Sequence, residues 1–407
     1  MKELIGGVCA AQGFRAAGIR CGIKALSKKR DLALIYSEKP CAAAAMFTAN
    51  RVKAASVLVS REYATRGQIR AVIANSGNAN ACTGEPGLAS ARRMAELAAR
   101  KLNIPTEQVA VASTGVIGVP LPITVIEGGI DALVESLRSD AEGHDAALEA
   151  IMTTDTRKKE AALELEIMGA PVRLGGMVKG AGMIHPNMAT MLCFITTDVL
   201  ISGECLDKAL RRAVNRSFNR VTIDGDTSTN DMVLIMANGE AGNPPIIAEG
   251  PDFQNFAAAL EALCVKLARD MARDGEGAAK LVTVIVQGAS DENTAAVFAK
   301  SVASSNLVKT ACFGADANWG RVLCALGYAG IDFDPNAVDV GFASRAGTIP
   351  VCQKGASVPF SEDAAKRILS EEEIAIHITL GTGPGEATVW GCDLTYDYIK
   401  INGDYRS

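Results

Sequence analysis

One stretch near the middle of the chain, residues 179–192 (KGAGMIHPNMATML), most restricts the possible folds, because glycine-rich residues lead directly into the apolar run 191–197. Glycine tolerates backbone conformations that other residues avoid, and a run of β-type residues after it indicates a turn followed by a strand. Thr190 stands where that strand begins. The ordinary interpretation is a loop that leads into a core strand, and the residues alone leave it open.

A second interpretation concerns the peptide bond between Ala189 and Thr190. If the chain is cut there, Thr190 carries a free α-amino group beside its own hydroxyl, which joins a nucleophile and a general base in one residue. An α-amine titrates near pH of about 7.7–8.0, so near neutrality part of it can accept the hydroxyl proton. Cys193 is a rival nucleophile, but strand alternation places it on the opposite face as a buried thiol.

Size and composition exclude several classes of function. The chain has 407 residues, enough for two or three domains, a net charge of −5 and only 5% aromatic residues, which argues against binding to nucleic acid. Three histidines, and eleven cysteines without a Cys-x-x-Cys pair, argue against a metal site and are typical of reduced thiols. We see no signal peptide or membrane-spanning segment and expect a cytoplasmic protein.

Apolar periodicity predicts a mixture of strands and helices. Strand-like runs lie at residues 32–36, 71–74, 192–197, 281–286, 374–380 and 387–394. Helical periodicity covers residues 88–102, 206–218 and 253–271. The irregular order predicts an α/β fold with α+β layers of mixed sheets rather than a Rossmann fold. We place the boundary after the turn at residues 274–277, so that 1–280 form a catalytic domain and 281–407 a C-terminal α/β domain whose tail closes the active site.

Two motifs suggest sites that their context argues against. Residues 381–385 (GTGPG) are glycine-rich, but strand-like runs flank them, whereas a phosphate-binding loop needs a following helix. A hairpin connection is predicted there instead. Asp224, Asp226 and Asp231 resemble calcium-loop carboxylates, but the closing glutamate of such a loop is absent. We interpret them as a structural or active-site loop.

Six further motifs accompany residues 179–192. They are residues 74–80 (ANSGNAN), 113–118 (STGVIG), 153–155 (TTD), 224–231 (DGDTSTND), 316–321 (DANWGR) and 401–407 (INGDYRS). Together, and over essentially the whole chain, they resemble the ornithine acetyltransferase (glutamate N-acetyltransferase) family of arginine biosynthesis. The resemblance implies a self-cleaving, N-terminal-threonine fold that is cut between Ala189 and Thr190. It also implies that an acetyl group moves from N2-acetyl-L-ornithine to L-glutamate through an acetyl-Thr190 intermediate.

The same resemblance assigns roles to individual residues. Thr190 is the nucleophile, and Thr114 with Gly115 forms the oxyanion hole. The residues implied to bind substrate are Thr153, Lys179, Thr190, Glu276, Asn402 and Ser407. Thr154, next to Thr153, is an alternative contact. Chemically, a lysine ammonium suits an α-carboxylate and a glutamate carboxylate suits the side-chain amine of ornithine.

No metal or cofactor is implied by the resemblance, although some members of the family use acetyl-CoA as a donor for glutamate. The implied partners are the small-molecule substrates and the two fragments of the cleaved chain, assembled as an α2β2 heterotetramer. Two other classes remain open. An N-terminal-nucleophile amidohydrolase or aminopeptidase would give the acyl group to water, and a non-enzymatic amino-acid-binding protein would remain a single chain.

Overall fold

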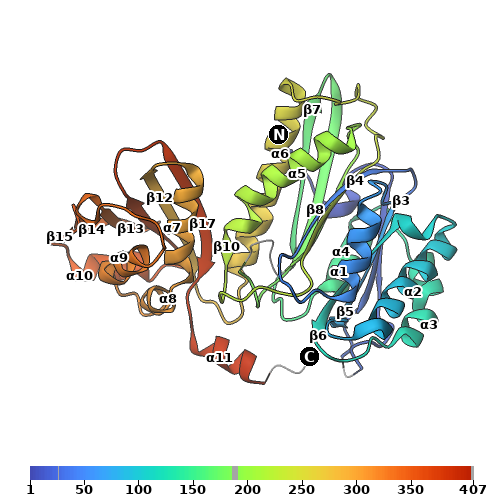
Figure 1. The fold of residues 1–407 in the computed structure, drawn as a ribbon, viewed down its shortest axis with the longest axis horizontal. Helices are drawn as coiled ribbons and strands as arrows, with labels where there is room; N and C mark the ends of the chain where they lie inside the picture. Colours follow the sequence, from blue (N-terminus) through green and yellow to red (C-terminus); the bar gives the residue numbers. More distant parts are fainter. Residues whose placement is uncertain (26, 186–190, 405–407) are drawn as a thin grey trace.

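Three sheets organise the chain (Figure 1), in a computed structural model that describes residues 1–25, 27–185 and 191–404. The six-stranded sheet has the order β1 (Lys2–Glu3), β7 (Lys159–Ile167), β8 (Ala170–Lys179), β9 (Leu192–Thr197), β11 (Met232–Ala237) and β4 (Ala42–Phe47). The four-stranded sheet has the order β2 (Phe14–Ile19), β3 (Leu32–Ser37), β5 (Ala71–Asn78) and β6 (Val109–Val116). The seven-stranded sheet has the order β10 (Val221–Thr222), β17 (Gly385–Cys392), β12 (Leu281–Ala289), β16 (Glu373–Thr379), β13 (Asp339–Ser344), β14 (Gly347–Gln353) and β15 (Ala356–Ser357).

Each sheet combines parallel and antiparallel pairs. In the six-stranded sheet, β11 runs parallel to β9 and antiparallel to β4. In the four-stranded sheet, β5 is antiparallel to β3 and parallel to β6. In the seven-stranded sheet, β12 is parallel to β16 and antiparallel to β17. The predicted α/β class with mixed sheets is confirmed, and none of the described sheets is the all-parallel sheet of a Rossmann fold.

Helices cover these sheets in layers. They are α1 (Ala55–Ala64), α2 (Gly84–Leu102), α3 (Ile123–Glu135), α4 (Ala141–Ile151), α5 (Gly203–Arg216), α6 (Pro251–Arg273), α7 (Glu292–Ser304), α8 (Asn306–Phe313), α9 (Trp319–Gly327), α10 (Glu362–Leu369) and α11 (Tyr396–Gly403). Helices α5 and α6 pack on one face of the six-stranded sheet, and α4 lies between its other face and the four-stranded sheet. Helices α2 and α3 cover the outer face of the four-stranded sheet.

Local sequence explains why α5 forms where it does. The Ser202 hydroxyl accepts from the Cys205 N–H at 3.3 Å and caps the first turn. Leu206, Leu210 and Val214 then recur every four residues and are buried, which creates the apolar stripe that packs against α6. The three predicted helices are confirmed as α2, α5 and α6, although α5 ends at Arg216, two residues before the predicted end. The six predicted strands are confirmed as β3, β5, β9, β12, β16 and β17.

Strand β9 lies between two hydrophobic cores. Cys193 and Ile195 belong to the core that includes α5 and α6, while Phe194 belongs to the core shared with the four-stranded sheet. The prediction that Cys193 is a buried thiol is confirmed. Burial raises its pKa well above the ordinary value, and a thiol held in the protonated form is a poor nucleophile.

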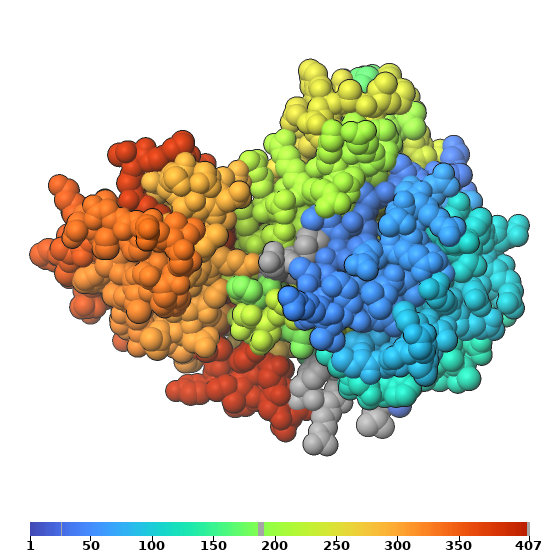
Figure 2. All heavy atoms as spheres, viewed as in Figure 1, coloured from blue at the N-terminus to red at the C-terminus, as the bar shows by residue number. Residues whose placement is uncertain are grey.

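The C-terminal residues form a lobe beside the rest of the molecule, shown in orange and red in Figure 2. The core of this lobe draws only on residues between Val282 and Val389, with α7 packed on β12 and β17. Helix α11 leaves the lobe and reaches back under the N-terminal part (Figure 1). The exact position of the domain boundary, near residue 280, stays a prediction. Among the described residues, no helix has the length and apolar character that a membrane span needs.

The connection at residues 381–385 corrects one prediction. Strands β16 and β17, on either side of it, do not pair with each other, because β12 lies between them. The segment therefore crosses over the end of β12 and is not a hairpin. Gly383 lies so close to β12 that a Cβ atom there would meet the Ala289 carbonyl oxygen at 2.0 Å, so the glycine allows close backbone packing.

Candidate active site

Six of the predicted site residues line one pocket of about 280 Å³. They are Thr114, Gly115, Thr153, Lys179, Glu276 and Asn402. They come from the ends of β6 and β8, the segment after α4, the turn after α6, and α11, which are far apart in the sequence. Ala189, Thr190 and Ser407 lie outside the described residues. Met183, seven residues before Thr190, and Ser228, four residues before β11, also line this pocket.

The predicted oxyanion donors stand at the end of β6, beside the end of β5. Gly115 has φ of +134°, and a Cβ atom there would meet the Gly77 backbone carbon at 2.3 Å. Only glycine therefore fits between these two strand ends. The side chain of Asn230 donates to the carbonyl oxygens of Ala79 and Ser113, at 2.7 Å each. The motifs at residues 74–80, 113–118 and 224–231 thus meet at one wall of the pocket.

Lys179 is the last residue of β8, and its side chain is buried. Its Nζ donates to Thr153 Oγ1 at 2.8 Å and, more weakly, to Thr114 Oγ1 at 3.4 Å. Between the adjacent threonines, Thr153 is the one that accepts from this lysine, although Thr154 lines the same pocket. Burial lowers the pKa of Lys179, and the nearby charge of Asp155 opposes that shift.

Glu276 brings a negative charge to the same pocket. It lies in the turn after α6 and is buried, with its backbone N–H donating to the Ala181 carbonyl at 2.8 Å. A Cβ atom on Gly182 would meet Glu276 Oε2 at 2.2 Å, so glycine allows the carboxylate to approach. Asn402 of α11 donates from Nδ2 to Glu276 Oε2 at 2.8 Å. The tail thus contacts the pocket through a residue that is otherwise exposed.

The residues on each side of the undescribed segment 186–190 are held in place. The carboxylate of Asp224 accepts from the backbone N–H groups of Met183 and Ile184, at 2.5 and 2.8 Å. This gives Asp224 a structural role, one of the two roles expected for the loop at residues 224–231. Beyond the segment, Met191 accepts from the Met232 N–H at 2.9 Å, where β9 and β11 begin side by side. Asp231 is buried there, and burial raises its pKa well above the ordinary value.

Comparison with known proteins identifies the family. The model of the ArgJ family matches residues 15–407. The chain belongs to the ArgJ family. It is 54% identical, over the full length of both chains, to the arginine biosynthesis bifunctional protein ArgJ of Symbiobacterium thermophilum. It is also 50% identical to ArgJ 1 of Clostridium acetobutylicum, over 97% of this chain and 96% of that protein.

A solved structure of an ArgJ protein, the crystal structure of the arginine biosynthesis bifunctional protein from Bacillus halodurans, is also similar. It is 46% identical with a TM-score of 0.50, and the match covers 52% of this chain and 98% of the solved chain. The solved chain is therefore about half as long as the present one.

Sequence reasoning missed the charged residues behind Lys179. Asp155, Lys159 and Asp274 are all buried, and Lys159 Nζ lies 2.6 Å from Asp155 Oδ1 and 2.5 Å from Asp274 Oδ2. The sequence contained one signal for this network. Asp155 is the last residue of the motif at residues 153–155, one of the motifs on which the family resemblance rests. Asp155 and Asp274 are separated by 118 intervening residues, so no local sequence pattern reveals the rest of the network.

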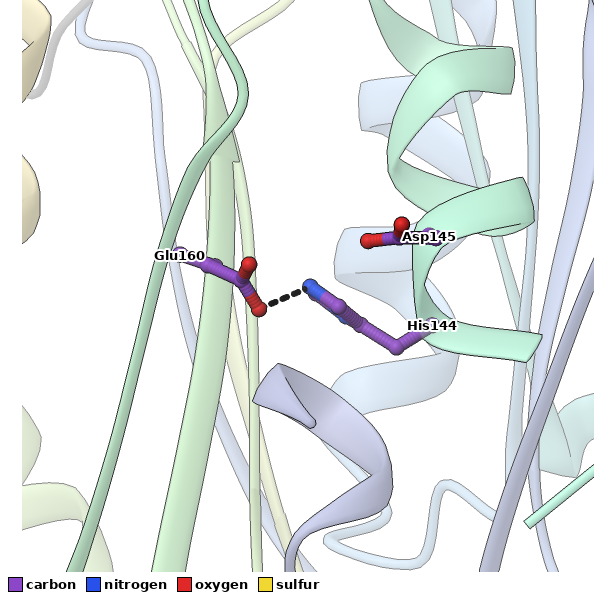
Figure 3. A group of neighbouring side chains, drawn as sticks. All are labelled: His144, Asp145 and Glu160. Carbon is purple, nitrogen blue, oxygen red and sulfur yellow. Dashed lines mark ion pairs between the residues drawn. The ribbon is translucent and has the colours of Figure 1, made fainter. Parts of the chain in front are cut away.

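A second group of side chains has the composition of a metal site, namely His144, Asp145 and Glu160 (Figure 3). His144 Nε2 lies 2.7 Å from Glu160 Oε2, between α4 and β7. The Val8 N–H donates to His144 Nδ1 at 3.3 Å, so the neutral ring carries its proton on Nε2, toward Glu160. A metal would need the Nε2 lone pair. The geometry therefore fits a contact between α4 and β7 better than a metal centre.

Proposed function

We propose that this chain is a self-processed acyltransferase that moves the acetyl group of N2-acetyl-L-ornithine to L-glutamate through an acetyl-Thr190 ester. The observation that carries the proposal is the pocket itself, which brings together Thr114, Gly115, Lys179 and Glu276 from distant parts of the chain. Membership of the ArgJ family supports the same reaction.

The charges of the pocket support an amino-acid substrate. Lys179 offers an ammonium group and Glu276 a carboxylate, and both line one cavity. N2-acetylornithine carries a carboxylate and a side-chain amine, the opposite charges at its two ends. We assign the carboxylate to Lys179 and the amine to Glu276, because buried charges are stable only when they are paired.

The arrangement around Thr114 supports stabilisation of an oxyanion. Because Lys179 donates to Thr114 Oγ1, the hydroxyl hydrogen of Thr114 points away from the lysine and is available to another acceptor. The Gly115 N–H is the second predicted donor. Donors that are held in place before the reaction stabilise a tetrahedral intermediate without the cost of reorganisation.

We infer two half-reactions. Thr190 Oγ attacks the acetyl carbonyl of acetylornithine while its proton passes to the Thr190 α-amine, and the amide C–N bond then breaks. Ornithine leaves with that proton. The α-amine of glutamate next attacks the ester, forms acetylglutamate and restores the Thr190 hydroxyl. Acetyl-CoA as an alternative donor is a further part of the proposal, which the word bifunctional in the relatives' names supports.

Self-processing at Ala189–Thr190 has independent support from the Bacillus halodurans structure. The match covers 52% of 407 residues, or about 212 residues, and this is 98% of the solved chain. Cleavage before Thr190 would leave residues 190–407 as one fragment of similar length. We propose that both fragments stay together, as an α2β2 heterotetramer in the cytoplasm. The eleven free thiols support a reducing compartment.

A denaturing gel and an acyl-transfer assay test the proposal together. We expect two fragments instead of one band near 42.4 kDa, and release of ornithine from acetylornithine that yields acetylglutamate when glutamate is present. Release of free acetate at the same rate with and without glutamate would favour an amidohydrolase. An intact chain without either activity would favour an amino-acid-binding protein and would overturn the proposal.

A further inference from the structure

Behind the pocket wall, four charged side chains are buried together. Lys159 bridges Asp155 and Asp274, as described above, and Lys179 Nζ lies 4.0 Å from Asp155 Oδ2. Asp155 is therefore close to both lysines. No ion pair joins Asp274 to Lys179 in the part of the chain that the structure describes. Of the two carboxylates, Asp155 is thus the one that is placed to act on the pocket.

Asp155 also holds the backbone on two sides of the pocket. Its Oδ2 accepts from the Thr153 N–H at 2.9 Å, and its Oδ1 accepts from the Gly180 N–H at 2.7 Å. Thr153 follows α4, and Gly180 follows Lys179 at the end of β8. One carboxylate therefore fixes the position of the Thr153 hydroxyl relative to the Lys179 ammonium, which donates to it.

We propose that Asp155 is a positioning residue for acyl transfer, which holds the Lys179 ammonium in place between Thr153 and Thr114. Through Lys179, it acts on both the carboxylate-binding point and the orientation of the Thr114 hydroxyl. The proposal rests on the role of Lys179 under the proposed function. It adds a residue that neither touches the substrate nor lines the pocket.

The charges around Lys179 determine in which direction each substitution should shift its pKa. Burial lowers the pKa of Lys179, the charge of Asp155 raises it, and the charge of Lys159 lowers it. The charged groups that act on Lys179 are Asp155, Lys159, Glu276, Asp231 and Lys24. For Asp155 itself, burial would raise the pKa, but the charges of Lys179 and Lys159 outweigh burial and hold it below its ordinary value. Asp155 is therefore charged at every pH used for an assay.

The experiment compares the pH profiles of kcat/KM for acetylornithine in two variants of the processed enzyme. Asp155→Asn keeps an acceptor for a backbone N–H but removes the charge. Because the Lys179 ammonium then loses its main support, we expect the alkaline limb to move down by about one to three pH units, the usual effect of one close opposite charge. Lys159→Met removes a repelling cation, so we expect its alkaline limb to move up.

Shifts of the alkaline limb in opposite directions in Asp155→Asn and Lys159→Met distinguish positioning from general damage to the fold. General damage would move both pH profiles in the same direction. Asp274→Asn is the matched control, since it disturbs the same network through Lys159 but makes no ion pair with Lys179. An alkaline limb that stays in place in folded Asp155→Asn, or that moves equally far in Asp274→Asn, overturns the proposal. If Asp155→Asn does not fold, Lys159→Met decides alone, and the absence of an upward shift is then the contrary result.

A third variant separates this inference from the proposed function. If Lys179→Met abolishes the alkaline limb while Asp155→Asn leaves it unchanged, Lys179 keeps its assigned role and only the role of Asp155 fails. If Lys179→Met retains the limb of the unmodified enzyme, the limb belongs to another group. In that case, the assignment of Lys179 under the proposed function fails together with the inference.

Discussion

Replacement of Glu276 by glutamine tests how one pocket serves two substrates with different side chains. Glu276 is buried and accepts from Asn402 Nδ2 at 2.8 Å. A glutamine in its place has nearly the same volume, and its carbonyl oxygen can still accept from Asn402. The substitution therefore removes the charge while the contact to the tail remains.

The expected effect differs in sign between the two substrates. A hydrogen bond to a charged group contributes about 1.5–3 kcal/mol, so loss of the contact to the ornithine amine should lower kcat/KM for acetylornithine by about 10- to 150-fold. Glutamate carries a carboxylate where ornithine carries the amine. Since Glu276 repels that carboxylate, Glu276→Gln should leave kcat/KM for glutamate unchanged or raise it.

Initial rates measured with each substrate varied in turn supply both values. Glu261→Gln is the control, because Glu261 lies in α6, before the turn that carries Glu276, and pairs with Arg212, at 3.3 Å, away from the pocket. We expect this control to change neither value by more than about twofold, as is usual for a partly exposed ion pair. Equal losses for acetylornithine and glutamate in Glu276→Gln would show that this carboxylate does not bind the side-chain amine.

Three further predictions concern the covalent mechanism. Thr190→Ala should remain a single chain of 42.4 kDa without activity, whereas the unmodified chain should give fragments of roughly 20 and 23 kDa by share of length, with Thr190 found first in the second fragment by N-terminal sequencing. Thr114→Ala should lower turnover by about 10²–10³-fold with little change in donor binding, measured by single-turnover kinetics. The rate should fall as the pH drops below about 7.7–8.0, because the protonated α-amine of Thr190 cannot accept the hydroxyl proton, and an acid limb that persists in a variant with a blocked α-amine would contradict this base.

The fold could be predicted from sequence where apolar periodicity is local. The run 192–197 and the helix over 253–271 carry their pattern within a few turns or pleats, and both elements are confirmed. The prediction of a hairpin at residues 381–385 was wrong, because strand pairing is not a local property. The flanking strands look like a hairpin in sequence, but β12, about a hundred residues earlier, inserts between them. Strand order depends on packing between distant segments, which a short pattern does not contain.

The candidate site shows the same limit. Lys179 and Thr153 could be named only by resemblance, since each alone is an ordinary loop residue. In the structure, Lys179 Nζ lies 2.8 Å from Thr153 Oγ1. The two residues meet because the Asp155 carboxylate accepts from the backbone on both sides, at Thr153 and at Gly180. Gly182 is a comparable case. Its sequence context suggests a flexible loop, whereas in the fold it leaves room for the Glu276 carboxylate.

The buried network behind the pocket is difficult to explain by stability alone. Replacing a buried ion pair or triad with apolar residues is often neutral or stabilising by about 1–4 kcal/mol, while removing one partner costs about 3–5 kcal/mol. A pocket that binds a carboxylate nevertheless needs a buried cation, and an isolated buried lysine loses its proton. The charge of Asp155 opposes the effect of burial on the pKa of Lys179. Lys159 and Asp274 complete a network of two lysines and two aspartates. The network is therefore best explained by function, since it favours the charged form of one ammonium group in a small buried pocket.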